Sequence, residues 1–196
     1  MRPELQPHSG HHINDTRSPC GDSPEEARDN HCAFDLLSFS WLPQRCYDAE
    51  ISAEFLNHSD WSWYKQGYHS ASELEPEPVH QSIVEQGGTG DLYVTGSYHL
   101  VHCLYMWRKL HRGMEVEARG LKPGISGAWI DSYTRDFAHT HHCSQYILDL
   151  ERRTHTASTA STDKSLELVS GALRSELDAI KVRIRTKYPG CPSEHK

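Results

Sequence analysis

A motif of the form His-x-x-His-Cys occurs twice in this chain, at residues 99–103 and 139–143. Residues three and four apart share one face of a helix, so each copy can project two imidazoles and one sulfur in the same direction. The neutral imidazole is the commonest metal ligand among side chains. Two such faces brought together would supply four imidazoles to one ion. The repeat therefore predicts a catalytic metal site formed by His99, His102, His139 and His142.

The six cysteines, at positions 20, 32, 46, 103, 143 and 191, predict three disulfides and an oxidising compartment. We expect a local bridge between Cys20 and Cys32, because a short helix is predicted between them. A bridge between Cys103 and Cys143 would hold the two motif helices in register. A bridge between Cys46 and Cys191 then follows by elimination. The alternative for the motif cysteines is thiolate ligation, which is disfavoured because a thiolate bound to a redox-active metal is itself oxidisable.

Charge and composition limit the classes of partner. The formal net charge is −7 and no basic stripe stands out, which argues against nucleic acid. Glycosylation sequons at Asn14 and Asn57 agree with a secretory-pathway lumen or a secreted protein. The sequence has no run of about 18 apolar residues, so neither a membrane span nor a signal peptide is predicted. Since a lumenal protein must enter the lumen, we expect the start at Met1 to be trimmed or misassigned.

The chain is long enough for one domain, for which we expect the α+β class. The prediction is a helix-dominated single domain with two motif-bearing helices, a small antiparallel sheet, long loops and disulfides. Residues 1–19 are expected to form a disordered tail, and residues 20–192 the domain. An aromatic core is expected from Phe39, Trp41, Phe55, Trp61 and Trp63.

Periodicity and capping residues place the individual elements. A first helix is expected after Ser23, with Pro24 as its first residue and Glu26 as its capping-box partner. Further helices are expected at 47–56, at the first motif up to a stop at Gly113, at the second motif up to Arg153, and at 166–177. Strands are expected at 91–95 and 180–185, paired with each other. Loops are expected at 66–90, at 114–130 and at about 154–164.

Residues around the motifs have weaker assignments. His141 should lie on a different helix face from His139, and His111 and His155 are expected to be bystanders. Asp131, Tyr133 and Asp136 precede the second motif, where they could orient an imidazole or simply start a helix. Tyr98 and Trp107 are expected to be core residues.

The two motifs resemble the signature of the UstYa-like proteins of fungal mycotoxin biosynthesis. The resemblance covers roughly residues 20–192 and includes the segments 20–21, 25–28, 32–35, 41–43, 46–48, 98–103, 105–112, 130–131, 139–140 and 188–192. It implies a lumenal oxidase domain, usually tethered by one N-terminal transmembrane helix. The lack of such a helix here departs from the family and affects the expected membrane attachment, but not the site.

The resemblance implies copper as the cofactor. The proteins of this family oxidise secondary metabolites by macrocyclisation, hydroxylation or halogenation of C–H bonds, and some work in pairs. A small-molecule or peptide metabolite and dioxygen or peroxide are therefore the expected partners, with a homodimer or a heterodimer as a further expectation. Copper also ranks above zinc for nitrogen ligands in the Irving–Williams order. The alternative is a non-catalytic lumenal scaffold braced by zinc, which favours four tetrahedral ligands.

Overall fold

The computed structural model describes residues 18–65, 78–124, 127–159, 171, 174–175, 177–179 and 181–193. Its helices are α1 (Pro24–Asp29), the 3₁₀ turn η1 (Gln44–Cys46), α2 (Ala49–His58), α3 (Gln81–Val84), α4 (Gly96–Ala118), α5 (Ser132–Arg135) and α6 (Phe137–Thr159). Its strands are β1 (Ala33–Asp35), β2 (Ser40–Leu42), β3 (Trp63–Tyr64), β4 (Pro78–Val79), β5 (Leu92–Thr95) and β6 (Lys181–Ile184). The fold is a helix-rich α+β domain with small antiparallel sheets, as predicted.

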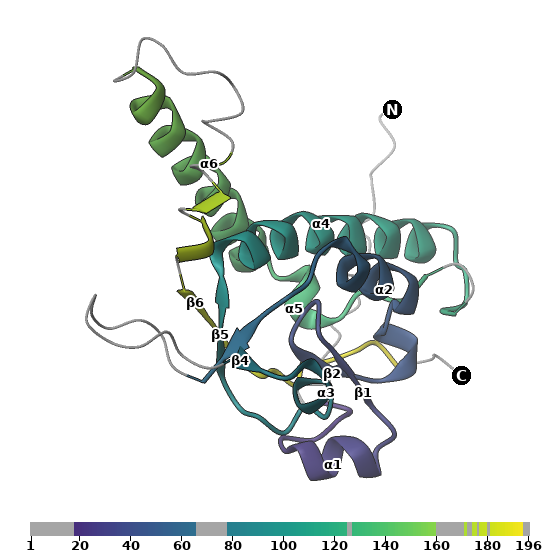
Figure 1. Cartoon of the computed structure of the whole chain (residues 1–196). Helices are drawn as coiled ribbons and strands as arrows, with labels where there is room; N and C mark the ends of the chain where they lie inside the picture. Colours follow the sequence, from purple (N-terminus) through teal and green to yellow (C-terminus); the bar gives the residue numbers. More distant parts are fainter. Residues whose placement is uncertain are drawn as a thin grey trace, which may run out of the picture.

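Two antiparallel sheets organise the chain. Strands β1 and β2 form a hairpin, and the larger sheet has the order β4-β3-β5-β6. Val94 pairs with Val182, which confirms the predicted pairing of the strand before the first motif with the C-terminal strand. Strand β5 continues directly into α4, which runs across Figure 1 above α2 and α5. The sheet therefore fixes where the first motif helix begins.

The predicted aromatic side chains lie in the core or at its edge. Phe39, Trp41, Phe55 and Trp63 are buried, and Trp61 packs against them at the edge. Rings of Phe55 and Trp61 stack with their centroids 5.0 Å apart. Helix α2 packs on α4 at this core, beside its C-terminal half in Figure 1. The first motif helix is thus covered on one side by aromatic surface.

Helix α1 begins as the sequence predicts. The Ser23 side chain accepts a hydrogen bond from the Glu26 amide at 3.2 Å, and Pro24 is the first helical residue. The Glu26 carboxylate accepts from the amide of Asp22 at 2.7 Å, whereas a capping box would use the amide of the next residue, Ser23. Two of the predicted disulfides are also present, Cys20–Cys32 and Cys46–Cys191. The second joins chain segments 145 residues apart.

Gly113 does not end the first motif helix, contrary to the prediction. Helix α4 continues through it to Ala118, so the expected loop at 114–130 begins later. A Cβ at position 113 would lie 2.5 Å from Cγ1 of Ile130 and 3.3 Å from the Ala128 carbonyl oxygen. Glycine is used here because the following segment packs directly on the helix backbone, and not because the helix must stop.

We expect Gly113→Ala to lower the free energy of unfolding by up to about 2 kcal/mol. Alanine gains up to about 1 kcal/mol of helix propensity, but the clash with Ile130 is an overpacking that costs about 1–3 kcal/mol. Urea unfolding measures the difference. Met114→Ala, at a neighbouring side chain that is 56% exposed, is the matched control and should change stability by less than about 0.5 kcal/mol. A stabilised Gly113→Ala protein would contradict the close packing.

Other expected loops are shorter than predicted. Strand β4 and helix α3 lie inside the expected loop at 66–90, of which residues 66–77 lie outside the described part. Helix α6 extends to Thr159, so the linker expected from residue 154 is helical at its start. The tail predicted at 1–19 and the helix predicted at 166–177 fall mostly outside the described residues. No described helix is long and apolar enough to cross a membrane.

Candidate metal centre

Helices α4 and α6 carry the two motifs and pack against each other. Thr95 caps α4 by accepting from the amide of Tyr98 at 3.1 Å. Helix α6 starts after Asp136, whose carboxylate accepts from the Ala138 amide at 2.9 Å. In Figure 1, α6 begins beside the N-terminal half of α4 and its distal part projects away from the other elements. The motif at the start of α6 is thereby placed opposite the motif of α4.

The four predicted histidines come together as two pairs across the two helices. The Nε2 atoms of His102 and His139 are 3.2 Å apart, and so are those of His99 and His142. The rings of His99 and His102 lie 5.9 Å apart, centroid to centroid. All four residues thus lie at one helix–helix contact. That they bind one ion together stays a prediction.

His102 is held by the backbone of a distant loop. Its Nδ1 donates a hydrogen bond to the Leu37 carbonyl oxygen at 2.6 Å, which requires the proton on Nδ1. The Nε2 lone pair therefore faces His139. The neighbouring Tyr98, buried as predicted, donates to the Leu36 carbonyl oxygen at 2.6 Å and so binds the same loop. No sequence pattern marks Leu37, because its contribution is a main-chain carbonyl.

His139 is supported by an aromatic ring. Tyr133 of α5 stacks on His139 with centroids 4.2 Å apart, and the ammonium of Lys187 lies 4.3 Å from the centroid of the Tyr133 ring. Of the three residues expected to orient an imidazole or start a helix, Tyr133 contacts the imidazole. Asp131 starts α5 by accepting from the Thr134 amide at 2.8 Å. Asp136 contributes its carbonyl oxygen to the His139 amide at 3.1 Å.

The predicted bridge between the motif cysteines is wrong. Cys103 and Cys143 are buried thiols. Cys143 Sγ lies 3.6 Å from Nε2 of His139, and its ligand atom lies within 4.8 Å of those of both His102 and His139. A hydrogen bond from Cys103 is the main cause that lowers the pKa of Cys143 below its ordinary value. The sulfur faces the histidine pair as a candidate ligand, a role that the sequence interpretation had disfavoured.

This donor set fits a metal ion. Two ligands that are each about 2.0–2.1 Å from one ion are separated by about 3–3.4 Å, which matches the Nε2 separations; a thiolate at about 2.3 Å fits the longer sulfur distance. His99 Nδ1 is buried, and none of the residues that the structure describes forms a hydrogen bond with it. Among the described residues, His102, His139 and Cys143 form the group of three whose ligand atoms are close enough for one ion. His99 and His142 offer two further nitrogens beside it.

Burial keeps the α4 imidazoles neutral, which is the form that binds metals. The pKa of His99 is lowered to about 4, mainly by burial and then by the charges of His142 and His139. The pKa of His102 is also lowered well below its ordinary value, again mainly by burial, although the bond to Leu37 opposes the shift. Both rings therefore remain able to bind a metal in mildly acidic solution.

We expect the metal-free protein to lose stability as the pH falls from about 6.5 to about 4. The unfolded chain protonates His99 near the ordinary value of 6.5, whereas the folded protein does so only near 4. Between these values the unfolded state binds more protons, so the stability present above pH 6.5 is lost on acidification. Urea unfolding at several pH values measures this slope. His99→Gln should flatten it, whereas His111→Gln, at a side chain 80% exposed, should not.

The other histidines behave as predicted where the structure describes them. His141 is exposed on α6, and its ring lies 6.2 Å from the exposed Phe137 ring. His111 is exposed on α4 and faces Glu115. The side chain of His155 lies outside the described part. Trp107, expected in the core, is half-buried, and its Nε1 is buried without a hydrogen-bond partner.

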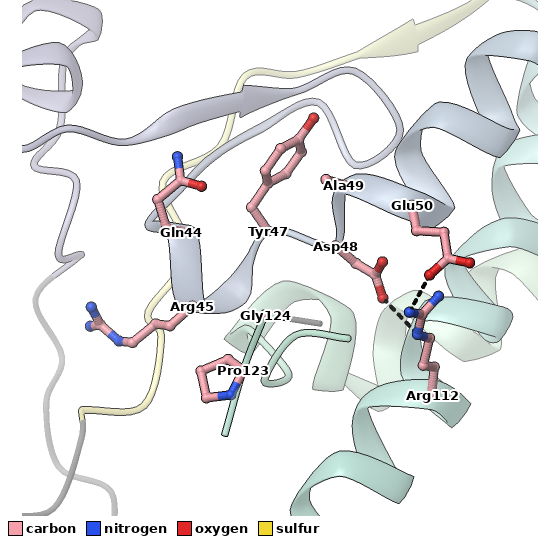
Figure 2. Close-up of a pocket in the computed structure, with 9 residues that line it drawn as sticks. All are labelled: Gln44, Arg45, Tyr47, Asp48, Ala49, Glu50, Arg112, Pro123 and Gly124. Carbon is pink, nitrogen blue, oxygen red and sulfur yellow. Dashed lines mark hydrogen bonds and ion pairs between the residues drawn. The ribbon is translucent and has the colours of Figure 1, made fainter. Parts of the chain in front are cut away.

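A cavity of about 550 Å³ lies elsewhere, between the start of α2 and the loop at Pro123 and Gly124 (Figure 2). None of the motif histidines lines it. Figure 2 shows Arg112 closing one side through its ion pairs with Asp48 and Glu50. This cavity is therefore separate from the candidate metal centre.

Comparison with known proteins indicates the biological setting. The chain is 29% identical over 141 residues to phomopsin biosynthesis cluster protein B and, equally, to phomopsin biosynthesis cluster protein B′, both from Diaporthe leptostromiformis. The match covers 69% of this chain and 38% of each relative, so the chain corresponds to well under half of their length. No protein-family model matches the chain, and no solved structure matches it. The chain is thus similar to proteins of a fungal secondary-metabolite biosynthesis cluster.

Proposed function

We propose that this chain is a copper-dependent oxidase of a fungal secondary metabolite and a UstYa-like protein. The observation that carries the proposal is the convergence of both motifs, which places four imidazoles in two Nε2 pairs at 3.2 Å. The similarity to phomopsin cluster proteins supports a role in metabolite biosynthesis. Oxidative cyclisation, hydroxylation and halogenation of a C–H bond are the reactions proposed for it.

Copper bound here would supply one-electron redox chemistry with dioxygen or peroxide. The chain's own residues hold and shield the site. Leu37 fixes the tautomer of His102, and Tyr133 fixes the ring plane of His139. His99 and His102 are 6% and 7% exposed, so the α4 side of the site excludes water. These residues keep the ligands in one geometry while the substrate reacts.

The α6 side is the side from which we propose that substrate approaches. His142 is exposed, in contrast to both histidines of α4. Phe137, two residues before His139, is 75% exposed and offers an apolar surface to a metabolite. A small molecule or peptide could therefore reach the histidine pairs without any change in the buried core.

The proximity of the Cys143 sulfur to His139 favours one alternative, a non-catalytic module braced by zinc. Two imidazoles and a thiolate are common in closed zinc sites, and the histidine pairs could supply the fourth ligand. Under this alternative the chain would scaffold a related partner protein. Copper is preferred because it ranks above zinc for the four nitrogen ligands in the Irving–Williams order and because the relatives belong to a biosynthetic cluster.

We further propose a location in the secretory-pathway lumen or outside the cell. The two disulfides fit an oxidising compartment. Asn57, in the second sequon, is exposed near the end of α2, where a glycan would meet solvent. Pairing with a second copy or with a related protein is part of the same proposal.

The test is to remove all metal from the purified chain and restore Cu(II) or Zn(II) separately. Oxygen uptake is then followed with metabolites of the same biosynthetic cluster. Recovery with copper alone, together with a changed product mass, is the expected result. Tight zinc binding without oxygen consumption under any condition would favour the scaffold and contradict the oxidase.

A further inference from the structure

A buried lysine, Lys109 of α4, contacts two buried carboxylates from different parts of the chain. Its Nζ lies 3.2 Å from Asp35 Oδ2 and 3.3 Å from Asp131 Oδ2. The side chains are 3%, 0% and 0% exposed, respectively. Burial opposes the charge on Lys109, but the two aspartates outweigh it and raise its pKa. The lysine is therefore a permanent positive charge enclosed in the core.

Each carboxylate controls one of the segments that hold the metal-facing histidines. Asp35 accepts from the Leu37 amide at 3.1 Å and from the Ser38 hydroxyl at 2.7 Å, and so sets the conformation of the loop whose Leu37 carbonyl binds His102. Ser52 of α2 donates to the same carboxylate at 2.8 Å. The Leu37 carbonyl, which fixes the His102 tautomer, thus lies two residues after Asp35, one of the two carboxylates that contact Lys109.

Asp131 acts on the other histidine. It caps α5 through the amide and hydroxyl of Thr134, at 2.8 and 2.7 Å. Tyr133, the residue directly before Thr134, stacks on His139. The orientation of α5 therefore decides where the Tyr133 ring lies and, through it, the plane of the His139 imidazole.

We infer that Lys109 is a positioning residue for the His102–His139 pair. One ammonium holds Asp35 and Asp131 together, and thereby fixes the Leu37 carbonyl and the Tyr133 ring relative to each other. This role rests on the proposed metal site. Only a site that needs a defined distance between the Nε2 atoms of His102 and His139 requires the Leu37 carbonyl and the Tyr133 ring to be held in fixed positions relative to each other. Groups that orient metal ligands in this way typically account for about 10- to 100-fold in affinity.

The test removes the charges without leaving any of them alone in the core. The variant combines Lys109→Met, Asp35→Asn and Asp131→Asn. In each asparagine the amide oxygen can still accept the backbone bond, from Leu37 or from Thr134, and the amide nitrogen can donate to the hydroxyl of Ser38 or Thr134. The matched control, Arg108→Met with Glu54→Gln, removes an exposed ion pair between α4 and α2. Cu(II) affinity, the Cu(II) EPR spectrum and the ¹⁵N shifts of His102 in the metal-free chain are compared.

We expect the triple variant to bind Cu(II) about 10- to 100-fold more weakly, with an altered EPR spectrum and a mixture of His102 tautomers. The control should match the wild type. A folded triple variant with wild-type affinity, spectrum and tautomer would overturn the inference and leave Lys109 a purely structural role.

Two further results keep the test decisive. If the triple variant does not fold, the single variant Asp131→Asn replaces it, because this variant retains the Lys109–Asp35 ion pair. It should change the His139 resonances and the EPR spectrum but leave the His102 tautomer unchanged. Unchanged His139 resonances would overturn the inference. If the wild type binds no Cu(II), the proposed function fails separately, and the metal-free ¹⁵N shifts still decide the positioning role.

Discussion

His102→Ala should weaken Cu(II) binding by about 100- to 1,000-fold. Structural metal sites release about 10–16 kcal/mol, so each of three or four ligands accounts for roughly 3–4 kcal/mol of binding. His102 is the ligand whose lone pair is fixed, because its other nitrogen donates to Leu37. Competition with a chelator of known affinity measures the loss. Oxygen uptake by the copper-loaded protein should disappear together with the affinity.

The fold should survive this substitution. The Leu37 carbonyl loses its donor, which costs about 1–3 kcal/mol, while both disulfides remain. His111→Ala on the same helix is the matched control, since its side chain is 80% exposed. Cys143→Ser provides a second comparison, because it removes the sulfur but neither imidazole. A His102→Ala protein that binds copper like the His111→Ala protein would contradict the site.

Lys109→Met should lower the free energy of unfolding by about 3–5 kcal/mol at pH 7. The substitution leaves Asp35 and Asp131 buried beside each other without their cation, and a buried charge that loses its partner is costly. Urea unfolding followed by circular dichroism measures the change. Part of it should return when both aspartates are also replaced by asparagine, because no buried charge then remains.

Arg108→Met is the comparison for that result. Arg108 is the adjacent residue of α4, and its ion pair with Glu54 is more than half exposed on the arginine side. An exposed pair of this kind contributes about 0–1 kcal/mol. Equal losses of stability in the Lys109→Met and Arg108→Met proteins would show that the buried cluster contributes no more than a surface contact.

Local sequence signals predicted the elements that depend on neighbouring residues. The cap at Ser23, the helix around Phe55 and the strand 181–184 form where the sequence places them, because capping and periodicity act within one or two turns. The prediction failed at Gly113, where the reason for glycine is contact with Ile130, 17 residues later. A local pattern cannot distinguish a helix stop from a close helix contact.

The cysteines show the same limit. The bridges Cys20–Cys32 and Cys46–Cys191 were predicted, the first from a short helix and the second only by elimination. The third bridge was wrong because sequence spacing does not say where a sulfur points. In the folded chain Cys143 faces His139, which makes it a candidate ligand.

The sequence by itself determined which residues could bind a metal, since the spacing within each motif places His99 with His102 and His139 with His142 on their helices. Only the tertiary structure decided the pairing, which joins His102 to His139 and His99 to His142 across the helices. No local sequence pattern marked Lys109 as buried, and its two partners lie 74 and 22 residues away along the chain. Such contacts depend on how helices and loops pack, because electrostatic and metal-binding geometry is set by distances in space and not along the chain.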